Sequence, residues 1–197
     1  MKGVTYICNS QKESIIDRIT VGDKNFRLYI PFEEFSKDID RVAGELQRDF
    51  GQSEVPPVML CTLNGAMMFC SELLKRCSFP LELASVKVSS YAGTSSTGVV
   101  EVKQELSCDV SGRDVIIIED IVDTGFTIQL MKQYLEKKGA RSSRICTLFY
   151  KPESFRFKDS IRLDYVAREI QNQFIVGFGL DYNELGRNSK DIYILDE

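Results

Sequence analysis

The chain has 197 residues, a length typical of one domain with a sizeable core. Lys and Arg total 25 against 29 Asp and Glu, and the net charge of −4 argues against general nucleic-acid binding. Histidine is absent, which excludes Ser-His-Asp and Cys-His catalysis and histidine-ligated zinc or haem. A general base must be a carboxylate, Lys, Tyr or Cys. A metal site must use oxygen atoms, which suits Mg²⁺ or Ca²⁺, or thiolates.

The six cysteines form no C-x-x-C pair, so neither a zinc ribbon nor a redox motif is indicated, and we expect buried, reduced thiols. The first ten residues lack the apolar core of a signal peptide. The longest uncharged stretch, 55–71, is interrupted by two prolines, Asn64 and Gly65 and cannot span a membrane. We therefore expect a cytoplasmic protein.

Two patterns predict the secondary structure. Apolar residues at helical spacing indicate helices, and short continuous apolar runs indicate buried strands. The first helix is followed by Gly51, a residue type that often ends helices. In chain order we expect a helix over 32–50, a strand over 58–63, a helix from Ala66 to about Arg76, strands over 81–88, 99–106 and 114–118, a helix over 127–138, and strands over 144–148, 164–166, 174–177 and 192–195.

Strands that alternate with helices imply βαβ units, and hence a parallel sheet with helices on both faces. Residues 89–98 are mostly Ser, Thr and Gly and cannot bury much surface, so we expect a mobile surface loop there. The chain shows no repeat, low-complexity tract or linker. The sequence thus predicts a single α/β domain.

The most informative segment follows the β-branched run 115–118. Two carboxylates, Glu119 and Asp120, come first, and Asp123 then precedes a Thr-Gly-x-Thr turn into the next helix. Such a turn can cradle a phosphate with backbone N–H groups and hydroxyls, whereas three carboxylates would repel a bare phosphate. A phosphorylated sugar with Mg²⁺ would suit both features. Plain helix capping by Asp123 or Thr124 is the alternative for those two residues, but it leaves Glu119 and Asp120 unexplained.

Residues 119–127 resemble the phosphoribosyl-pyrophosphate signature of the type I phosphoribosyltransferases. Further segments resemble the hypoxanthine-guanine branch of that family, in order from about Val58 to the end of the chain. They are Leu63-Asn64-Gly65 as the pyrophosphate loop, Ser89-Ser90-Tyr91 as the head of a catalytic flap, 149–152 around a base-reading lysine, and 174–184 with Arg187 as the purine pocket. The resemblance implies a central, mainly parallel sheet flanked by helices, with a mobile loop and a small hood built from the termini of one domain, 1–197.

The reaction implied by the resemblance is Mg²⁺-dependent transfer of 5-phosphoribose from phosphoribosyl pyrophosphate to N9 of hypoxanthine or guanine, giving IMP or GMP and pyrophosphate. Its transition state resembles an oxocarbenium ion, which nearby carboxylates stabilise. Glu119 and Asp120 would hold the ribose hydroxyls and contribute to a metal site with Asp181. Asp123 would be the general acid/base near purine N7.

The resemblance also assigns the binding residues. Lys151 would donate to O6 of the base, Phe174 would stack on it, and the Ile175 backbone would bind its other edge. A solvated surface charge is the alternative for Lys151, and a simple core position is the alternative for Phe174. The residues implied for phosphoribosyl pyrophosphate or the nucleotide are Asn64, Gly65, Ser90, Tyr91, Glu119, Asp120, Asp123, Thr124, Gly125, Phe126, Thr127 and Arg187.

The chain departs from the family pattern at two positions. Asn64 stands where relatives often carry a basic residue, so a charge near pyrophosphate is missing. Phe126 stands at a variable position that is often polar. The family pattern also implies a cis, non-proline peptide bond at Leu63-Asn64.

Two other functions are compatible with the motifs. One is a regulator that senses phosphoribosyl pyrophosphate and binds DNA or RNA, but the chain has no basic excess for that purpose. The other is an enzyme of the same class that prefers xanthine. The enzyme acting on small-molecule substrates is favoured, with no nucleic-acid or membrane partner, and the family implies a homodimer or homotetramer.

Overall fold

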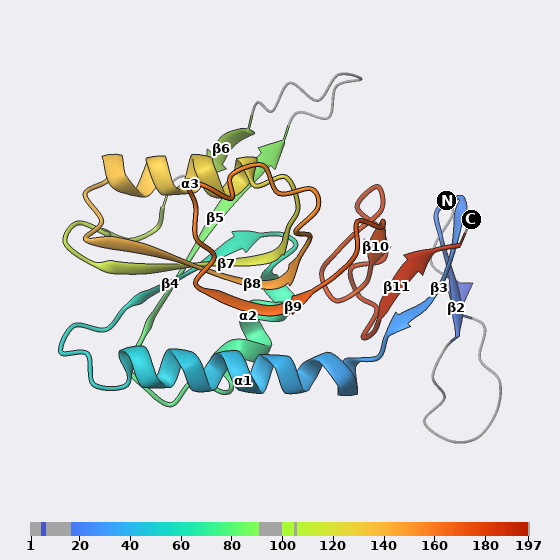
Figure 1. Ribbon diagram of the computed structural model, residues 1–197, viewed down its shortest axis with the longest axis horizontal. Helices are drawn as coiled ribbons and strands as arrows, with labels where there is room; N and C mark the ends of the chain where they lie inside the picture. The colour runs from blue at the N-terminus through green and yellow to red at the C-terminus, as the bar shows by residue number, and fades with distance from the viewer. Residues whose placement is uncertain (1–4, 7–16, 91–99, 105, 197) are drawn as a thin grey trace.

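Two β-sheets organise the chain (Figure 1). The computed structural model describes residues 5–6, 17–90, 100–104 and 106–196. Within these residues no helix is long and apolar enough to cross a membrane.

The central sheet has six strands in the order β6-β5-β4-β7-β8-β9, and all of its pairs are parallel except the one between β5 and β6. This arrangement confirms the predicted α/β fold with a mainly parallel sheet. The strands are β4 (Val58–Leu63), β5 (Glu82–Ser90), β6 (Val100–Gln104), β7 (Asp114–Val122), β8 (Ser142–Tyr150) and β9 (Tyr165–Glu169).

Helices cover both faces of the central sheet (Figure 1). Helices α1 (Phe32–Phe50) and α2 (Met67–Leu74) lie on one face, and α3 (Phe126–Lys137) lies on the other. Successive residues of a strand alternate between the two hydrophobic cores, so Ile116 packs with α1 and α2, whereas Ile117 packs with α3. A strand buried on both faces must be apolar throughout, which explains why the continuous apolar runs predicted these strands.

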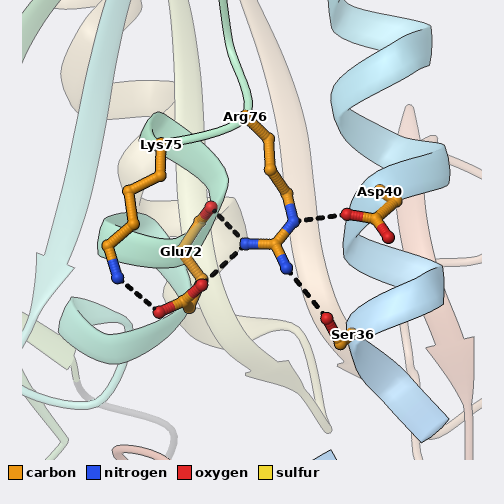
Figure 2. Close-up of polar contacts among 5 residues, drawn as sticks. All are labelled: Ser36, Asp40, Glu72, Lys75 and Arg76. Carbon is orange, nitrogen blue, oxygen red and sulfur yellow. Dashed lines mark hydrogen bonds and ion pairs between the residues drawn. The ribbon is translucent and has the colours of Figure 1, made fainter. Parts of the chain in front are cut away.

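Arg76, just beyond the end of α2, ties α2 to α1 (Figure 2). Its Nε donates to Asp40 Oδ1 at 2.5 Å and its Nη2 donates to Ser36 Oγ at 2.8 Å, both on α1. Its Nη1 also donates to the main-chain oxygen and carboxylate of Glu72 on α2. The guanidinium thus fixes the helix that follows the turn after β4.

The second sheet, the terminal sheet, is antiparallel, with strand order β1-β2-β3-β11-β10. Its first three strands were not predicted from the sequence. A hairpin pattern could have identified β2 and β3, because apolar Ile19 and Val21 alternate with polar residues just before Gly22. In the structure both apolar residues are buried, and Gly22 turns the chain at φ +64°. The strands are β1 (Thr5–Tyr6), β2 (Arg18–Val21), β3 (Lys24–Ile30), β10 (Ile175–Val176) and β11 (Ile192–Leu195).

Aromatic rings join the terminal sheet to the central one. Phe178, which follows β10, lies 5.0 Å from Phe35 of α1 and 5.5 Å from Phe32, measured between ring centroids. Phe35 in turn lies 5.9 Å from Phe149 near the end of β8. The N-terminus of α1 belongs to the same junction, because the Phe32 N–H donates to Asp191 Oδ1 at 2.8 Å.

Several predicted boundaries need correction, among them that of the strand predicted over 164–166, which is observed as Tyr165–Glu169. β7 and β8 run on to Val122 and Tyr150, because their pairing continues through Val122↔Tyr150, so Glu119 and Asp120 lie within a strand rather than after it. Ser89 and Ser90 belong to β5 and not to the loop. The remainder of that loop, 91–98, lies outside the described residues.

The five cysteines within the described residues are free thiols. Cys61, Cys70 and Cys146 are buried, as expected, whereas Cys77 and Cys108 are only half-buried. Burial raises the pKa of Cys77 to about 11.

Candidate active site

The carboxyl ends of the parallel strands β4, β7 and β8 meet at one edge of the central sheet, and this edge faces the terminal sheet (Figure 1). Two glycines allow the segments there to touch. A Cβ added to Gly65 would lie 1.9 Å from Asp120 Oδ2, and one added to Gly179 would lie 2.0 Å from the main-chain oxygen of Gly65. The turn after β4, the end of β7 and the segment after β10 are therefore in direct contact.

The turn after β4 has the geometry that the family pattern implies. The Leu63–Asn64 peptide bond is cis. The Ala66 N–H donates to the Thr62 oxygen at 3.1 Å, and the Met67 N–H donates to the Asn64 oxygen at 3.3 Å, which leads the chain into α2. Asn64 and Gly65 are half-buried at this edge of the sheet.

Glu119 and Asp120 form an electrostatically costly pair. Glu119 is 5% exposed, and its Oε1 has no hydrogen-bond partner among the described residues. Burial raises the pKa of Glu119 well above its usual range, and the charge of Asp120 raises it further. Burial also raises the pKa of Asp120 to about 6, opposed by hydrogen bonds such as that from the Ile121 N–H, and by Arg187. Because a buried carboxyl oxygen without a partner is expensive, this pair is suited to bind a ligand.

The turn between β7 and α3 is shaped by Gly125, which has φ +89° and precedes the first residue of α3. A Cβ at this position would lie 2.4 Å from the Phe155 ring, so only glycine fits. No side chain caps α3, so the capping interpretation of Asp123 and Thr124 is wrong. The N–H groups at the start of this helix are thus left without a side-chain cap, as a phosphate cradle would require.

Phe126, the first residue of α3, packs against an aromatic ring and a guanidinium. Its ring contacts Phe157 nearly at right angles, with centroids 5.3 Å apart, and the Arg156 guanidinium lies 5.5 Å from it. The side chain is therefore engaged in packing, which explains how an apolar residue is tolerated at this position.

Lys151 follows β8 directly and is a buried cation. It is 7% exposed, and its Nζ lies 3.0 Å from Asp123 Oδ2. Its N–H donates to the Val122 oxygen at 3.0 Å, which fixes the backbone of Lys151 against the end of β7. The surface-charge interpretation of Lys151 is therefore wrong. The structure brings one cation and one carboxylate together, at the end of two neighbouring strands.

Asp181 and Arg187 lie side by side. Arg187 Nη2 is 2.8 Å from Asp181 Oδ1 and 2.7 Å from Glu184 Oε2, and its Nη1 donates to the Gly179 oxygen at 2.7 Å. Because Gly179 contacts Gly65, the guanidinium is fixed close to the turn after β4. Its charge also lowers the pKa of Asp120, whereas that of Asp181 raises it.

Phe174 and Ile175, two of the residues expected at the purine, differ in their exposure to solvent. Ile175 is buried in β10 and pairs with Ile194, whereas the Phe174 side chain is 46% exposed. A simple core position is therefore wrong for Phe174, whose ring has an open surface. Ser90 ends β5, and its side chain and Tyr91 lie outside the described residues.

Two supporting residues were missed by the sequence reasoning, Gly179 and Phe155. Gly179 has φ +101° and permits the contact with Gly65. Phe155 packs against Gly125 and so helps to shape the turn before α3. The sequence signal for each is weak, since a lone Gly between apolar residues, or a lone Phe between polar ones, is common.

Among the described residues no cluster of three or more Cys, Asp or Glu side chains could enclose a metal ion. The acidic donors at the edge are instead single carboxylates, one of them the buried Glu119 with its unpartnered oxygen. Such a donor set fits a cation that arrives with phosphate ligands of its own, as Mg²⁺ commonly does.

Residues 31–183 match the family model for the phosphoribosyl transferase domain. A hypoxanthine-guanine phosphoribosyltransferase of Streptococcus thermophilus strain CNRZ 1066 is 42% identical over 154 residues, which cover 78% of this chain and 83% of that protein. One of Streptococcus pneumoniae strain R6 is 34% identical over 172 residues, covering 87% and 93%. A crystal structure of a hypoxanthine phosphoribosyltransferase from Staphylococcus aureus superimposes with a TM-score of 0.78 at 35% identity, covering 86% of this chain and 91% of that one.

Proposed function

The chain belongs to the phosphoribosyl transferase domain family, as a pentosyltransferase, and we propose that it transfers 5-phosphoribose from phosphoribosyl pyrophosphate to N9 of hypoxanthine or guanine. The products are IMP or GMP and pyrophosphate. The observation that carries this proposal is the buried Lys151 ammonium, which lies 3.0 Å from the half-exposed Asp123 carboxylate beside the turn into α3.

The pair suits one edge of a 6-oxopurine. O6 and N7 of guanine are neighbouring acceptors on the same edge of the base. The Lys151 ammonium donates to O6 and rejects the amino group of adenine, which is itself a donor. Asp123 then lies by N7, where a carboxyl group can give or take a proton as the N9 bond forms. With no histidine in the chain, a carboxylate is the natural choice for this step.

The phosphate end of the substrate fits the turn into α3. The 5′-phosphate accepts hydrogen bonds from the backbone N–H groups and the hydroxyls of Thr124 and Thr127, and the positive φ of Gly125 supports this geometry. The N-terminal end of the helix dipole favours the negative charge.

Glu119 and Asp120 suit the ribose. Substrate hydroxyls can donate to the unpartnered Oε1 of Glu119 and to the Asp120 carboxylate. Negative charge on this pair would lie close to where the sugar becomes positive in the transition state. Asp181, with help from these carboxylates, would hold Mg²⁺ together with the substrate's oxygens, and the cation would supply positive charge for the leaving pyrophosphate. Arg187 and the backbone of Asn64-Gly65 bind the pyrophosphate oxygens.

A nucleotide-formation assay tests the proposal. The purified chain is incubated with phosphoribosyl pyrophosphate and, separately, hypoxanthine, guanine, xanthine or adenine, with and without Mg²⁺. We expect IMP or GMP only when Mg²⁺ is present, and no AMP. Product from xanthine alone would overturn the preference for hypoxanthine or guanine proposed here. Binding of phosphoribosyl pyrophosphate without product from any base would overturn the enzyme proposal in favour of a sensor.

A further inference from the structure

Three aromatic rings contact one another beside the terminal sheet: those of Phe26, Phe174 and Tyr182. Phe26 of β3 is fully buried and lies 6.3 Å from the Phe174 ring. Tyr182 lies 6.0 Å from Phe174 at an interplanar angle of 88°, and 6.4 Å from Phe26. Edge-to-face contacts of this kind are favourable and directional. Phe174 is 46% exposed, so part of its surface is open to solvent. Phe26 and Tyr182 contact its ring from the protein side.

Tyr182 is itself held by the turn between β2 and β3. Its Oη donates to Asp23 Oδ1 at 3.0 Å, and this hydrogen bond raises the pKa of the Tyr182 phenol. A Cβ added to Gly22 would lie 3.5 Å from Tyr182 Cε1, so the ring lies against the turn. The Lys24 Nζ lies 5.6 Å from the ring centroid. Three successive residues of the turn thus contact one side chain that is distant in the sequence.

The neighbouring residue has a different set of contacts. Asp181 interacts with Arg187, whereas Tyr182 contacts Asp23 and the Phe174 ring. The main chain of Tyr182 is fixed as well, by two hydrogen bonds with Leu185 at 2.9 and 3.1 Å. Tyr182 is therefore in a position to affect the base without touching the groups assigned to pyrophosphate.

We propose that Tyr182 is a positioning residue that fixes the Phe174 ring for stacking on the purine, and that Asp23 holds Tyr182 in place. The proposal rests on the function proposed above for the Phe174 ring. It makes the β2–β3 turn a determinant of purine affinity, although no residue of that turn touches the base.

Steady-state kinetics test the proposal. Tyr182→Leu removes the edge-to-face contact, and we expect KM for hypoxanthine or guanine to rise about 2- to 10-fold. KM for phosphoribosyl pyrophosphate and kcat should change less than the purine KM. Tyr182→Phe keeps the ring and should give a smaller rise. Tyr134→Phe, which removes a hydroxyl from α3 on the central sheet, is the matched control. Equal increases in both KM values, or no change in Tyr182→Leu, would overturn the proposal.

Variants of Asp23 separate the hydrogen bond from general damage to the turn. Asp23→Ala should raise the purine KM as Tyr182→Phe does, and the double variant should show no further rise, because both changes remove the same bond. Asp23→Asn keeps an oxygen acceptor and should lose less than Asp23→Ala. Additive losses in the double variant would contradict the role of Asp23.

A fluorescence experiment separates this proposal from the proposed function. The chain has no tryptophan, so Phe174→Trp introduces a single tryptophan, which can be excited selectively over the eight tyrosines, at the position of interest. Adding Tyr182→Leu to that variant should lower the fluorescence anisotropy and increase quenching by acrylamide, without any substrate. If the wild-type chain forms no nucleotide, the proposed function fails, but this measurement still tests whether Tyr182 positions the ring. Unchanged anisotropy and quenching would refute the positioning role.

Discussion

The two sheets contribute different chemistry to the candidate site. The edge of the central sheet carries charged groups held by close backbone contacts, such as Asp120 against Gly65 and the turn at Gly125 against Phe155. The terminal sheet carries aromatic rings, of which Phe174 is half-exposed. At Gly65 and Gly125 the central sheet leaves no room for an added methyl group. At the terminal sheet the rings contact one another, and we expect the orientation of Phe174 to depend on these contacts. Changes in the first region should therefore act on chemistry, and changes in the second on affinity for the base.

The largest effect is expected at Asp123. Asp123→Asn keeps the size of the side chain but removes the acid/base group, so turnover should fall by ~10²- to 10⁴-fold. Binding of phosphoribosyl pyrophosphate, measured by calorimetry, should change little. Because the variant also leaves the buried Lys151 ammonium facing a neutral partner, melting temperatures should be recorded in parallel. A loss of affinity as large as the loss of turnover would contradict the acid/base role.

A smaller but still large effect is expected at Gly65. In Gly65→Ala the new methyl group would lie 1.9 Å from Asp120 Oδ2, so the carboxylate or the turn must move. A shift of about 1 Å among binding groups can cost ~100-fold in activity, and kcat/KM for phosphoribosyl pyrophosphate should fall by about this much. Gly44→Ala is the matched control, because an added Cβ there meets nothing within 4 Å on an exposed face of α1. That control should keep full activity and gain about 0.5–1 kcal/mol of stability.

The ionised Asp120 carboxylate should lower the free energy of unfolding of the protein without substrate. Its pKa is raised from 3.8 to about 6, so its favourable contribution to folding is present below pH 3.8 and is lost as the pH rises through 6. Asp120→Asn should therefore increase the free energy of unfolding at pH 8, by about 1–3 kcal/mol, while activity falls.

The pH dependence of that gain is the stricter test, since it should disappear near pH 4. Asp114, at the other end of β7, is the opposite case because the Arg141 guanidinium lowers its pKa. Asp114→Asn should destabilise the protein at pH 8, and this effect should decrease at low pH as the wild-type carboxyl protonates. Denaturant melts from roughly pH 2.5 to 8 measure both variants, because the contribution of Asp114 is lost only as the pH falls below its usual pKa of 3.8. A pH-independent gain in Asp120→Asn would contradict the electrostatic explanation.

The sequence predicted the central sheet well because its signals are local. Helix 32–50 and strand 58–63 have the observed bounds, since one face of the helix and both faces of the strand must be apolar to be buried. The ends of β7 and β8 were missed. In β7 the apolar run is interrupted by Glu119 and Asp120, and the extension of both strands to Val122 and Tyr150 is set by their pairing with each other.

The terminal sheet could not be predicted to the same extent. β10 has two residues and β11 has four. β11 pairs with β3 from the other end of the chain, and β10 pairs in turn with β11. The contact of Tyr182 with Asp23 joins residues 159 positions apart, and no local pattern encodes it. The family resemblance indicated the purine residues of the sheet but not what supports them.

The smallest effect is expected at Asn64, where relatives often carry a basic residue. Asn64→Lys adds one positive charge to the turn next to Asp120 and Gly65, without changing the backbone contacts that define it. An exposed charge pair contributes about 0.2–1 kcal/mol, so KM for phosphoribosyl pyrophosphate should fall about 1.5- to 5-fold. Raising the salt concentration screens such a pair, and the gain should shrink accordingly. Asn64→Gln, which adds length but no charge, should leave this KM near the wild-type value at every salt concentration. If Asn64→Gln matched Asn64→Lys, the missing charge would not be what distinguishes this turn, and the central edge would depend on its backbone shape alone.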